Sequence, residues 1–246
     1  MKTQGTNEEM LFTHVSVNCV LMGISNDKLC VLLVERKDLA GNVLGYKLPG
    51  SLIYDGEDLD AAAVRTLNET TGLKRVQLRQ FRCFGSPSRT SNESDRLWLE
   101  ESLQMKIGRL ISIAYLAFCK NGRNIAMDNQ DSSMYWCPVD ALPDLPFDHL
   151  EIITAAVQEI RGWIEREPAI VFNYLPSKFT AFQLRRVFEI IYNKTLDVRN
   201  FHKKMSTLEY IVQTDDQETG VSHRAARYYR FDKIKYNKQR SKINKN

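Results

Sequence analysis

The residues between positions 48 and 73 have side chains whose types and spacing could hold a metal ion against a phosphate. The segment reads LPGSLIYDGEDLDAAAVRTLNETTGL. This pattern predicts a strand, a glycine-containing loop and a helix that ends at a glycine. Positions 66, 69 and 70 lie on one face of such a helix. Three carboxylates there would suit Mg²⁺, which prefers oxygen ligands, but this chain has Thr66 and Thr70 and keeps only Glu69. The residues therefore predict no metal site.

This segment resembles the Nudix box, the loop–helix–loop with which Nudix hydrolases hold divalent metal against a diphosphate. The box runs Gly, five residues, Glu, seven residues, then Arg-Glu-apolar-any-Glu-Glu-any-Gly-apolar. Ser51 occupies the first Gly position, directly after Gly50, and the matching residues are Glu57, Arg65, Leu67, Glu69, Gly72 and Leu73. The resemblance implies the Nudix fold. Because threonine replaces two metal-binding glutamates, we predict that the protein is not an enzyme and has no catalytic residue and no cofactor. An ordinary amphipathic helix after a glycine turn is the alternative.

The composition is that of a globular protein that dissolves in water. The chain has 246 residues, of which 43% are hydrophobic and 26% are charged, enough for one large domain or two small ones. No apolar run approaches the length that spans a bilayer, and the first residues, MKTQGTNEEM, lack the apolar core of a signal peptide. The five cysteines form no CxxC motif, and most of them lie in apolar, strand-like runs, which indicates buried free thiols. These features predict a cytoplasmic protein with no membrane partner.

Charge is distributed unevenly along the chain, although the net charge is only +4. Residues 1–172 contain 18 Lys and Arg against 23 Asp and Glu, whereas residues 173–246 contain 16 against 7. A basic block at one end is typical of a polyanion partner, usually nucleic acid. A merely solvated basic end is the alternative for residues 233–246.

Alternating and apolar runs in the first two thirds of the chain predict a sheet. Residues 12–21 alternate, with Ser16 and Asn18 on a side that either lines a cavity or meets solvent at the sheet edge. Further strands are predicted at residues 29–36, 46–48, 109–118 and 134–139, and a closing helix at 148–161. Polar residues on strands near the box are our candidates for binding a small ligand, namely Asn18, Arg36, Lys47, Arg109 and Ser112.

Residues 85–106 follow no single period and exceed the corresponding link of Nudix proteins, so we interpret them as an insertion. Their opening is rich in Ser, Asn and Asp. The apolar residues that follow fit an extended alternation, with a short helix as the alternative; they are Leu97, Leu99, Leu103 and Met105. The insertion either covers the pocket, contacts a partner subunit or is a plain surface excursion.

The basic segment predicts a helix–turn–helix followed by a hairpin. Residues 180–192 and 197–208 are capped amphipathic helices, with strands at 210–214 and 227–231. The predicted inner residues are Phe182, Leu184, Val187, Phe188 and Ile191 in the first helix and Val198, Phe201, Met205 and Leu208 in the second. The second helix of such a domain enters the major groove of DNA. Its outer face and the hairpin supply the candidate DNA-binding residues Arg199, Asn200, His202, Lys203, Lys204, Arg224 and Arg227. A solvated helix face is the alternative.

Three motifs in this segment resemble the Nudix-related transcriptional regulators of NrtR type: TAFQLRR from Thr180, DVRNFHKK from Asp197 and HRAARYYRF from His223. The wing of that family usually runs Gly-Arg-Pro-Ala, where this chain has His-Arg-Ala-Ala. The resemblance implies a homodimer that binds a palindromic DNA operator and releases it when a small ligand binds the Nudix-like domain. In that family the ligand is an NAD-derived metabolite such as ADP-ribose, or a sugar, including pentoses.

Together these features predict an α+β chain, with a Nudix-like α/β/α sandwich at residues 1–168 and a winged helix-turn-helix domain with a basic tail at 169–246. We expect a DNA-binding transcriptional regulator with a non-catalytic, effector-binding sensor. A sugar effector, with a pentose as one candidate, is favoured over ADP-ribose, because loss of the metal-binding acids makes a pyrophosphate ligand less natural and a neutral sugar more so. One alternative is a Nudix hydrolase with an added nucleic-acid module, in which Glu57 and Glu69 hold metal. Another is an RNA-binding protein, although the basic segment lacks an aromatic stacking sheet.

Overall fold

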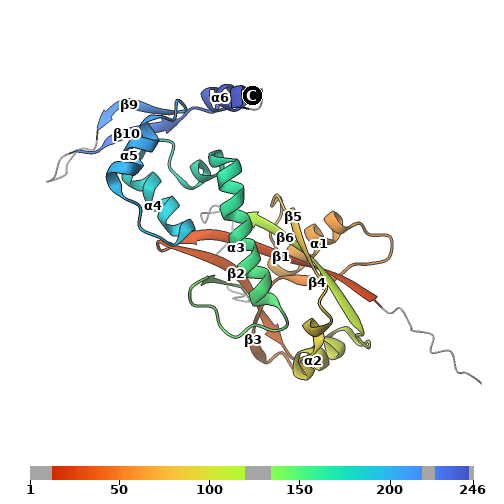
Figure 1. Cartoon of the computed structure of the whole chain (residues 1–246). Coiled ribbons are helices and arrows are strands. Elements are labelled where there is room, and N and C mark those ends of the chain that lie inside the picture. Colours follow the sequence, from red (N-terminus) through yellow and green to blue (C-terminus); the bar gives the residue numbers. More distant parts are fainter. Residues whose placement is uncertain (1–12, 120–133, 218–224, 244–246) are drawn as a thin grey trace, which may run out of the picture. The chain divides into compact units, whose positions relative to one another are not determined.

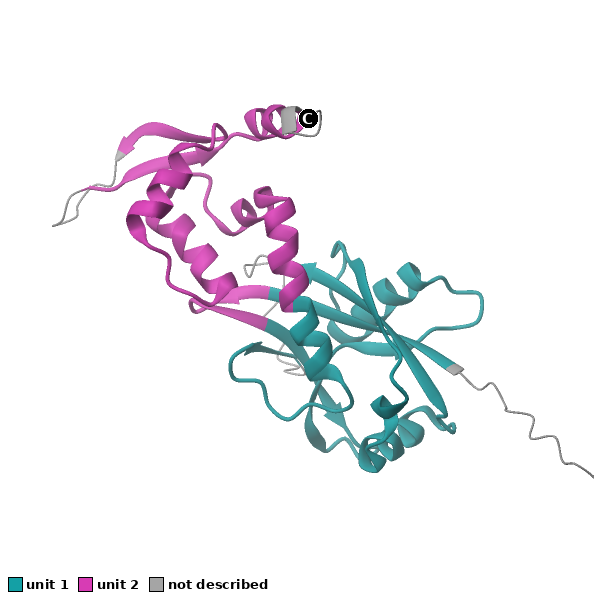
Figure 2. Ribbon diagram, in the orientation of Figure 1, with its two compact units in different colours: residues 1–22, 31–119, 125–156 teal, residues 23–30, 120–124, 157–246 magenta. Residues whose placement is uncertain are grey.

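The structure is a computed structural model, in which residues 13–119, 134–217 and 225–243 are described. The chain divides into two compact units (Figure 2). Of the described residues, the first unit holds 13–22, 31–119 and 134–156, and the second holds 23–30, 157–217 and 225–243. The division falls inside helix α3 (His149–Arg166), which therefore contributes residues to both units. No helix in the described ranges is long and apolar enough to cross a bilayer.

A mixed seven-stranded sheet forms the centre of the first unit (Figure 1). Five strands run in the order β3-β2-β1-β6-β5, while β4 pairs with β1 and β7 pairs with β2. Their bounds are β1 (Thr13–Ser25), β2 (Lys28–Lys37), β3 (Val43–Lys47), β4 (Gly50–Leu52), β5 (Arg79–Phe84), β6 (Arg109–Phe118) and β7 (Met134–Pro138). β1 and β6 are parallel, from Thr13 opposite Arg109 to Met22 opposite Phe118. Because β1 is an inner strand, its polar side chains do not lie at a sheet edge.

One face of this sheet is covered by α1 (Leu59–Thr71), the helix of the box. Asp58 caps the helix by accepting a hydrogen bond from the Ala61 N–H. Gly72 ends it at a φ of 69°, which glycine adopts without strain. The helix packs on one side of β1 and β6, and the shared core contains Val17, Cys19, Leu21, Ala62, Ala63, Leu67, Ile113, Tyr115 and Ala117.

The 85–106 segment folds as two short helices on the opposite side of the sheet, beside the start of α3. They are η1 (Pro87–Thr90) and α2 (Glu93–Leu103). The Asn92 side chain caps α2, and acidic residues in its first turn suit the positive end of the helix dipole. These local signals outweigh the weak alternation, so the extended conformation expected here is wrong for Leu97, Leu99 and Leu103.

The second unit contains the helices and hairpin expected for the basic segment (Figure 1). The expected elements are α4 (Ala181–Tyr192), α5 (Val198–Ser206), β9 (Ile211–Gln217) and β10 (Arg227–Phe231). The unit also contains η2 (Pro168–Tyr174), β8 (Phe179–Thr180) and α6 (Lys233–Ile243), which were not predicted from the sequence. A capping box between Thr180 and Gln183 starts α4, and Asp197 caps α5. The three strands pair in the order β8-β10-β9. The predicted winged helix-turn-helix fold is confirmed.

An aromatic cluster holds this unit together. Phe172 stacks on Phe231 with ring centres 4.3 Å apart, and Tyr210 meets Tyr236 of α6 edge-on at 5.1 Å. Most of the predicted inner residues are buried or partly buried. The two exceptions are wrong predictions in the first turns of their helices, where the exposed fractions are 61% for Phe182 and 49% for Val198.

Candidate functional site

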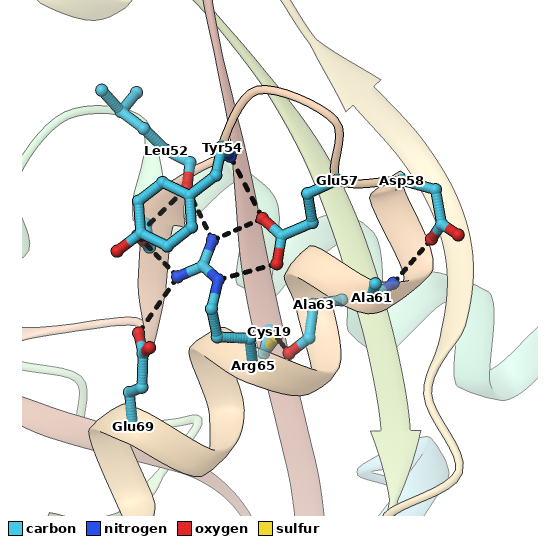
Figure 3. A network of polar contacts seen from close by, with 10 residues as sticks. Cys19, Leu52, Tyr54, Glu57, Asp58, Ala61, Ala63, Arg65 and Glu69 are labelled. Atoms are coloured by element: carbon cyan, nitrogen blue, oxygen red, sulfur yellow. Dashed lines mark hydrogen bonds and ion pairs between the residues drawn. The ribbon is translucent and has the colours of Figure 1, made fainter.

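Arg65 binds both carboxylates that the box retains (Figure 3). Its guanidinium donates two hydrogen bonds to Glu57, at 2.7 and 2.8 Å, and one to Glu69 at 3.0 Å. It also donates to the Leu52 carbonyl at 2.9 Å and lies 3.9 Å from the centre of the Tyr54 ring. Hydrogen bonds from Arg65 are the main reason that the pKa of Glu57 is lowered. The two acids are thus members of an ion-pair cluster that ties the loop to the helix.

The two threonines of the box do not share an open face with Glu69. Thr66 is fully buried, and its hydroxyl has no hydrogen-bond partner among the described residues. The Thr70 hydroxyl donates to the Thr66 carbonyl at 2.7 Å, and Glu69 points to Arg65 (Figure 3). Within the described ranges, no group of three His, Cys, Asp or Glu residues could hold a metal ion.

A cavity of about 250 Å³ opens on the side of the sheet opposite α1. Polar side chains from four parts of the chain line it, namely Ser16, Asn18, Lys47, Ser51, Arg89, Ser102 and His149. Its apolar wall includes the rings of Trp98 and Phe147 together with Leu99 and Leu103. Helix α2 of the 85–106 segment therefore supplies part of the cavity wall.

Asn18 is held in this wall by two neighbours. The Ser112 hydroxyl on β6 donates a hydrogen bond to the Asn18 Oδ1, and both residues are buried. Gly50 on β4 passes so close that an added Cβ would lie 2.3 Å from the Asn18 Nδ2. Glycine at position 50 therefore permits the close approach of β4 to Asn18.

Lys47 lies in the cavity wall with no carboxylate partner in the described part of the chain. Within the described ranges, its ammonium donates a hydrogen bond to the carbonyl of the neighbouring Leu48, at 3.4 Å. Burial, and then the positive charge of Arg36, lower the pKa of Lys47 to about 8. Arg36 itself pairs with Asp95, and its guanidinium carbon lies 4.7 Å from the centre of the Trp98 ring.

Four of the five candidate ligand residues therefore lie in or beside one cavity. Asn18 and Lys47 line it, while Ser112 and Arg36 support the lining residues Asn18 and Trp98. Arg109 is not among the lining residues, since it is exposed and donates to the Gly85 carbonyl at 3.2 Å.

Sequence reasoning missed Arg89 and Trp98, because both belong to the 85–106 segment, for which covering the pocket was one of three alternatives and no single residue was selected. Arg89 is buried, pairs with Asp148 at 3.0 Å and donates to the Phe84 carbonyl at 3.1 Å. A lone tryptophan in a polar segment is the signal that could have directed attention there.

His149 joins the cavity wall to the link between β3 and β4. Its Nδ1 accepts a hydrogen bond from the Leu48 N–H at 3.2 Å, and the side chain is buried. Burial, followed by the charges of Lys47, Arg89 and Arg36, lowers the pKa of His149 well below its usual value. The imidazole is therefore neutral, and the cations around the cavity are the lysine and the two arginines.

The outer face of α5 presents the polar residues expected from the sequence. All five side chains are exposed: Arg199, Asn200, His202, Lys203 and Lys204. Phe201 and Met205 face the interior, where Phe201 meets Phe188 edge-on at 6.1 Å. The Asn200 N–H donates to Asp197 at 2.8 Å, which leaves its exposed side chain for other contacts.

Of the two cations predicted to bind DNA from the wing, one is described. Arg227 on β10 is exposed and donates to the Gln213 side chain at 3.3 Å. Arg224, the other predicted wing residue, lies outside the described residues. Together α5 and β10 present charge and hydrogen-bonding groups of the kinds that contact phosphates and base edges.

Two known families match the two parts of the chain. Residues 12–156 match the NUDIX domain, and residues 171–231 match the NrtR DNA-binding winged helix domain. The chain is 24% identical over 221 residues to the ADPR responsive transcriptional repressor NtrR of Acinetobacter baylyi, covering 88% of this chain and 81% of that protein. It is 26% identical over 153 residues to the ADP-ribose pyrophosphatase of Methanocaldococcus jannaschii, covering 62% and 79%.

Solved structures share the fold along most of the chain. Shewanella oneidensis NrtR complexed with a 27mer DNA aligns with a TM-score of 0.63 at 22% identity, covering 91% of this chain and 95% of that one. A MutT/nudix family protein from Enterococcus faecalis aligns with a TM-score of 0.60 at 23% identity, covering 90% and 87%.

Proposed function

The chain belongs to the NUDIX family and carries an NrtR-type DNA-binding winged helix domain, and from this premise we propose that it is a transcriptional regulator with an effector-binding NUDIX domain. The exposed face of α5 is the observation that carries the proposal. Lysines 203 and 204 suit phosphates, Arg199 suits guanine, and Asn200 suits adenine. The similar protein of A. baylyi is a transcriptional repressor.

The domain limits and the assembly are part of this proposal. Residues 1–168 form the effector domain and residues 169–246 the DNA-binding domain. The protein acts as a homodimer on a palindromic operator, because two copies of α5 related by a two-fold axis read two equal half-sites.

The NUDIX domain is a sensor in this proposal and does not hydrolyse its ligand. Neutral threonines stand at two metal-binding positions of the box, and Arg65 engages both remaining acids. Hydrolysis of a nucleotide diphosphate is the second candidate function, because the chain is similar to an ADP-ribose pyrophosphatase and retains Glu57 and Glu69.

A sugar is the effector we favour. The cavity of about 250 Å³ is smaller than the roughly 300–1,000 Å³ of pockets that enclose drug-sized ligands, so it suits a monosaccharide. Trp98 offers a ring face, and Ser16, Asn18 and Ser102 offer hydrogen bonds to hydroxyl groups. ADP-ribose is the alternative effector, because the A. baylyi repressor is ADPR responsive.

The proposal is tested by selecting duplexes from a random DNA pool with the full-length protein and measuring their release by ADP-ribose and by pentoses. We expect a two-fold symmetric sequence to be enriched and one class of ligand to release it. Preference for RNA over every duplex would overturn the proposal. Rapid turnover of ADP-ribose with Mg²⁺ would instead support the hydrolase.

A further inference from the structure

The charged groups around the NUDIX cavity do not balance. Arg89 pairs with Asp148 at 3.0 Å, and Arg36 pairs with Asp95. Lys47 has no such partner in the described ranges, although the Arg36 and Arg89 pairs show that carboxylates are available on neighbouring elements. Lys47 is therefore a cation of the cavity wall that has no ion-pair partner among the described residues.

A partly buried ammonium without a counter-charge is unfavourable, because its lost hydration is not replaced. The pKa of Lys47, which burial and Arg36 lower to about 8, reflects this imbalance. His149 is neutral, so it neither adds a positive charge at the cavity nor offsets the charge of Lys47. An anionic group on a ligand would supply the missing charge.

The rest of the cavity limits the size and kind of that ligand. Its volume of about 250 Å³ leaves room for a single sugar ring, and the ring of Trp98 and the side chains of Ser16, Asn18 and Ser102 match the apolar face and hydroxyl groups of a sugar. We propose that the effector is an anionic monosaccharide, a sugar phosphate or a sugar acid, whose acidic group lies against Lys47. This inference rests on the proposed function, because it assigns the effector of the NUDIX domain.

The test is calorimetric titration of the full-length protein with ribose 5-phosphate, glucuronate, ribose, inorganic phosphate and ADP-ribose. We expect ribose 5-phosphate or glucuronate to bind at least tenfold more tightly than ribose and than inorganic phosphate. Lys47→Met should abolish that preference, Lys47→Arg should keep it, and the exposed control Lys74→Met should leave it unchanged. A higher affinity for ribose 5-phosphate than for glucuronate identifies a phosphate site, and a higher affinity for glucuronate identifies a carboxylate site.

Several results would overturn the inference without touching the proposed function. Equal binding of ribose and both acidic sugars, or a preference that survives in Lys47→Met, removes the role of charge. If inorganic phosphate binds as tightly as ribose 5-phosphate, the sugar does not contribute to binding. If ADP-ribose binds more tightly than every monosaccharide, the cavity does not limit the ligand to a single sugar. In each of these cases, release of DNA by the ligand that does bind would still support a regulator.

Discussion

At the scale of single residues, Thr66 explains why one substitution would not rebuild a metal site in the box. Its side chain is fully buried and its hydroxyl is without a hydrogen-bond partner in the described part of the structure. A carboxylate at this position would be charged, buried and unpaired, since Arg65 already binds Glu57 and Glu69.

We therefore predict opposite effects of two substitutions at position 66. Thr66→Val should change the free energy of unfolding by less than about 1 kcal/mol, because it removes an unpartnered hydroxyl at similar volume. Thr66→Glu should lower it by about 3 kcal/mol or more, because it buries an uncompensated charge. Urea unfolding at neutral pH measures both, and a glutamate variant as stable as the valine variant would contradict this assignment.

The lowered pKa of Lys47 leads to a separate prediction about the pH dependence of ligand affinity. With its pKa lowered to about 8, the ammonium is present below pH 8 and is lost above it. The affinity for ribose 5-phosphate should therefore fall as the pH rises from 7.0 to 9.5. Over this range His149 stays neutral, because burial lowers its pKa well below its usual value.

The matched control is Lys47→Arg, whose guanidinium keeps its proton throughout this range. Binding to that variant should be independent of pH between 7.0 and 9.5. An equal fall in the variant and in the natural protein would assign the pH dependence to another group.

At the scale of the elements, α5 combines two kinds of side chain with different consequences for binding. Lysines 203 and 204 are exposed cations suited to phosphates, and Asn200 is an exposed amide suited to a base edge. Contacts of the first kind release counterions and set the salt dependence of binding, whereas contacts of the second kind set the sequence preference.

We predict that replacing Lys203 and Lys204 by Gln reduces the slope of log affinity against log salt concentration by about 0.9 for each lost phosphate contact. Asn200→Ala should leave the slope unchanged and weaken discrimination at one base pair by about 1–3 kcal/mol. Lys74→Gln, in the other unit, is the control. Fluorescence anisotropy with the selected duplex and a one-base variant measures these quantities, and an unaltered slope in the double variant would exclude both lysines from the interface.

At the scale of the whole molecule, the proposed ligand cavity belongs to one unit and the proposed DNA-binding face to the other. An effector can shift DNA binding only by the difference in its affinity for the free and the DNA-bound protein. That difference is reciprocal, because both ligands bind the same molecule.

We therefore predict that the factor by which the effector weakens DNA binding equals the factor by which operator DNA weakens effector binding. Titrations of each ligand in the presence and absence of the other measure the two factors on the same preparation. The α5 double variant should lose DNA affinity while its effector affinity without DNA stays normal. Unequal factors would show that the binding of effector and of DNA is not coupled through one reversible equilibrium.

Local signals in the sequence determined the secondary structure of both domains to a large extent. The Asp58 cap and Gly72 stop delimit α1, and the capping residues Thr180, Gln183 and Asp197 start α4 and α5. These features could be predicted because each depends on hydrogen bonds between residues only a few positions apart. The same locality explains the wrong prediction in α2, where the interpretation followed a weak alternation, whereas a cap and an acidic first turn start a helix.

Which residues form the cavity depends on the tertiary structure. Ser112 meets Asn18 across 94 positions, and Arg36 meets Asp95 across 59. Such pairs depend on the strand order of the sheet and on where the 85–106 segment folds back, and no local period encodes either. The lack of a carboxylate beside Lys47 in the described part of the chain is of the same kind, because a missing partner becomes visible only when the neighbouring elements are in place. Local sequence signals thus determined which helices and strands form. The packing of these elements decided which charged side chains are left without a partner and can bind a ligand.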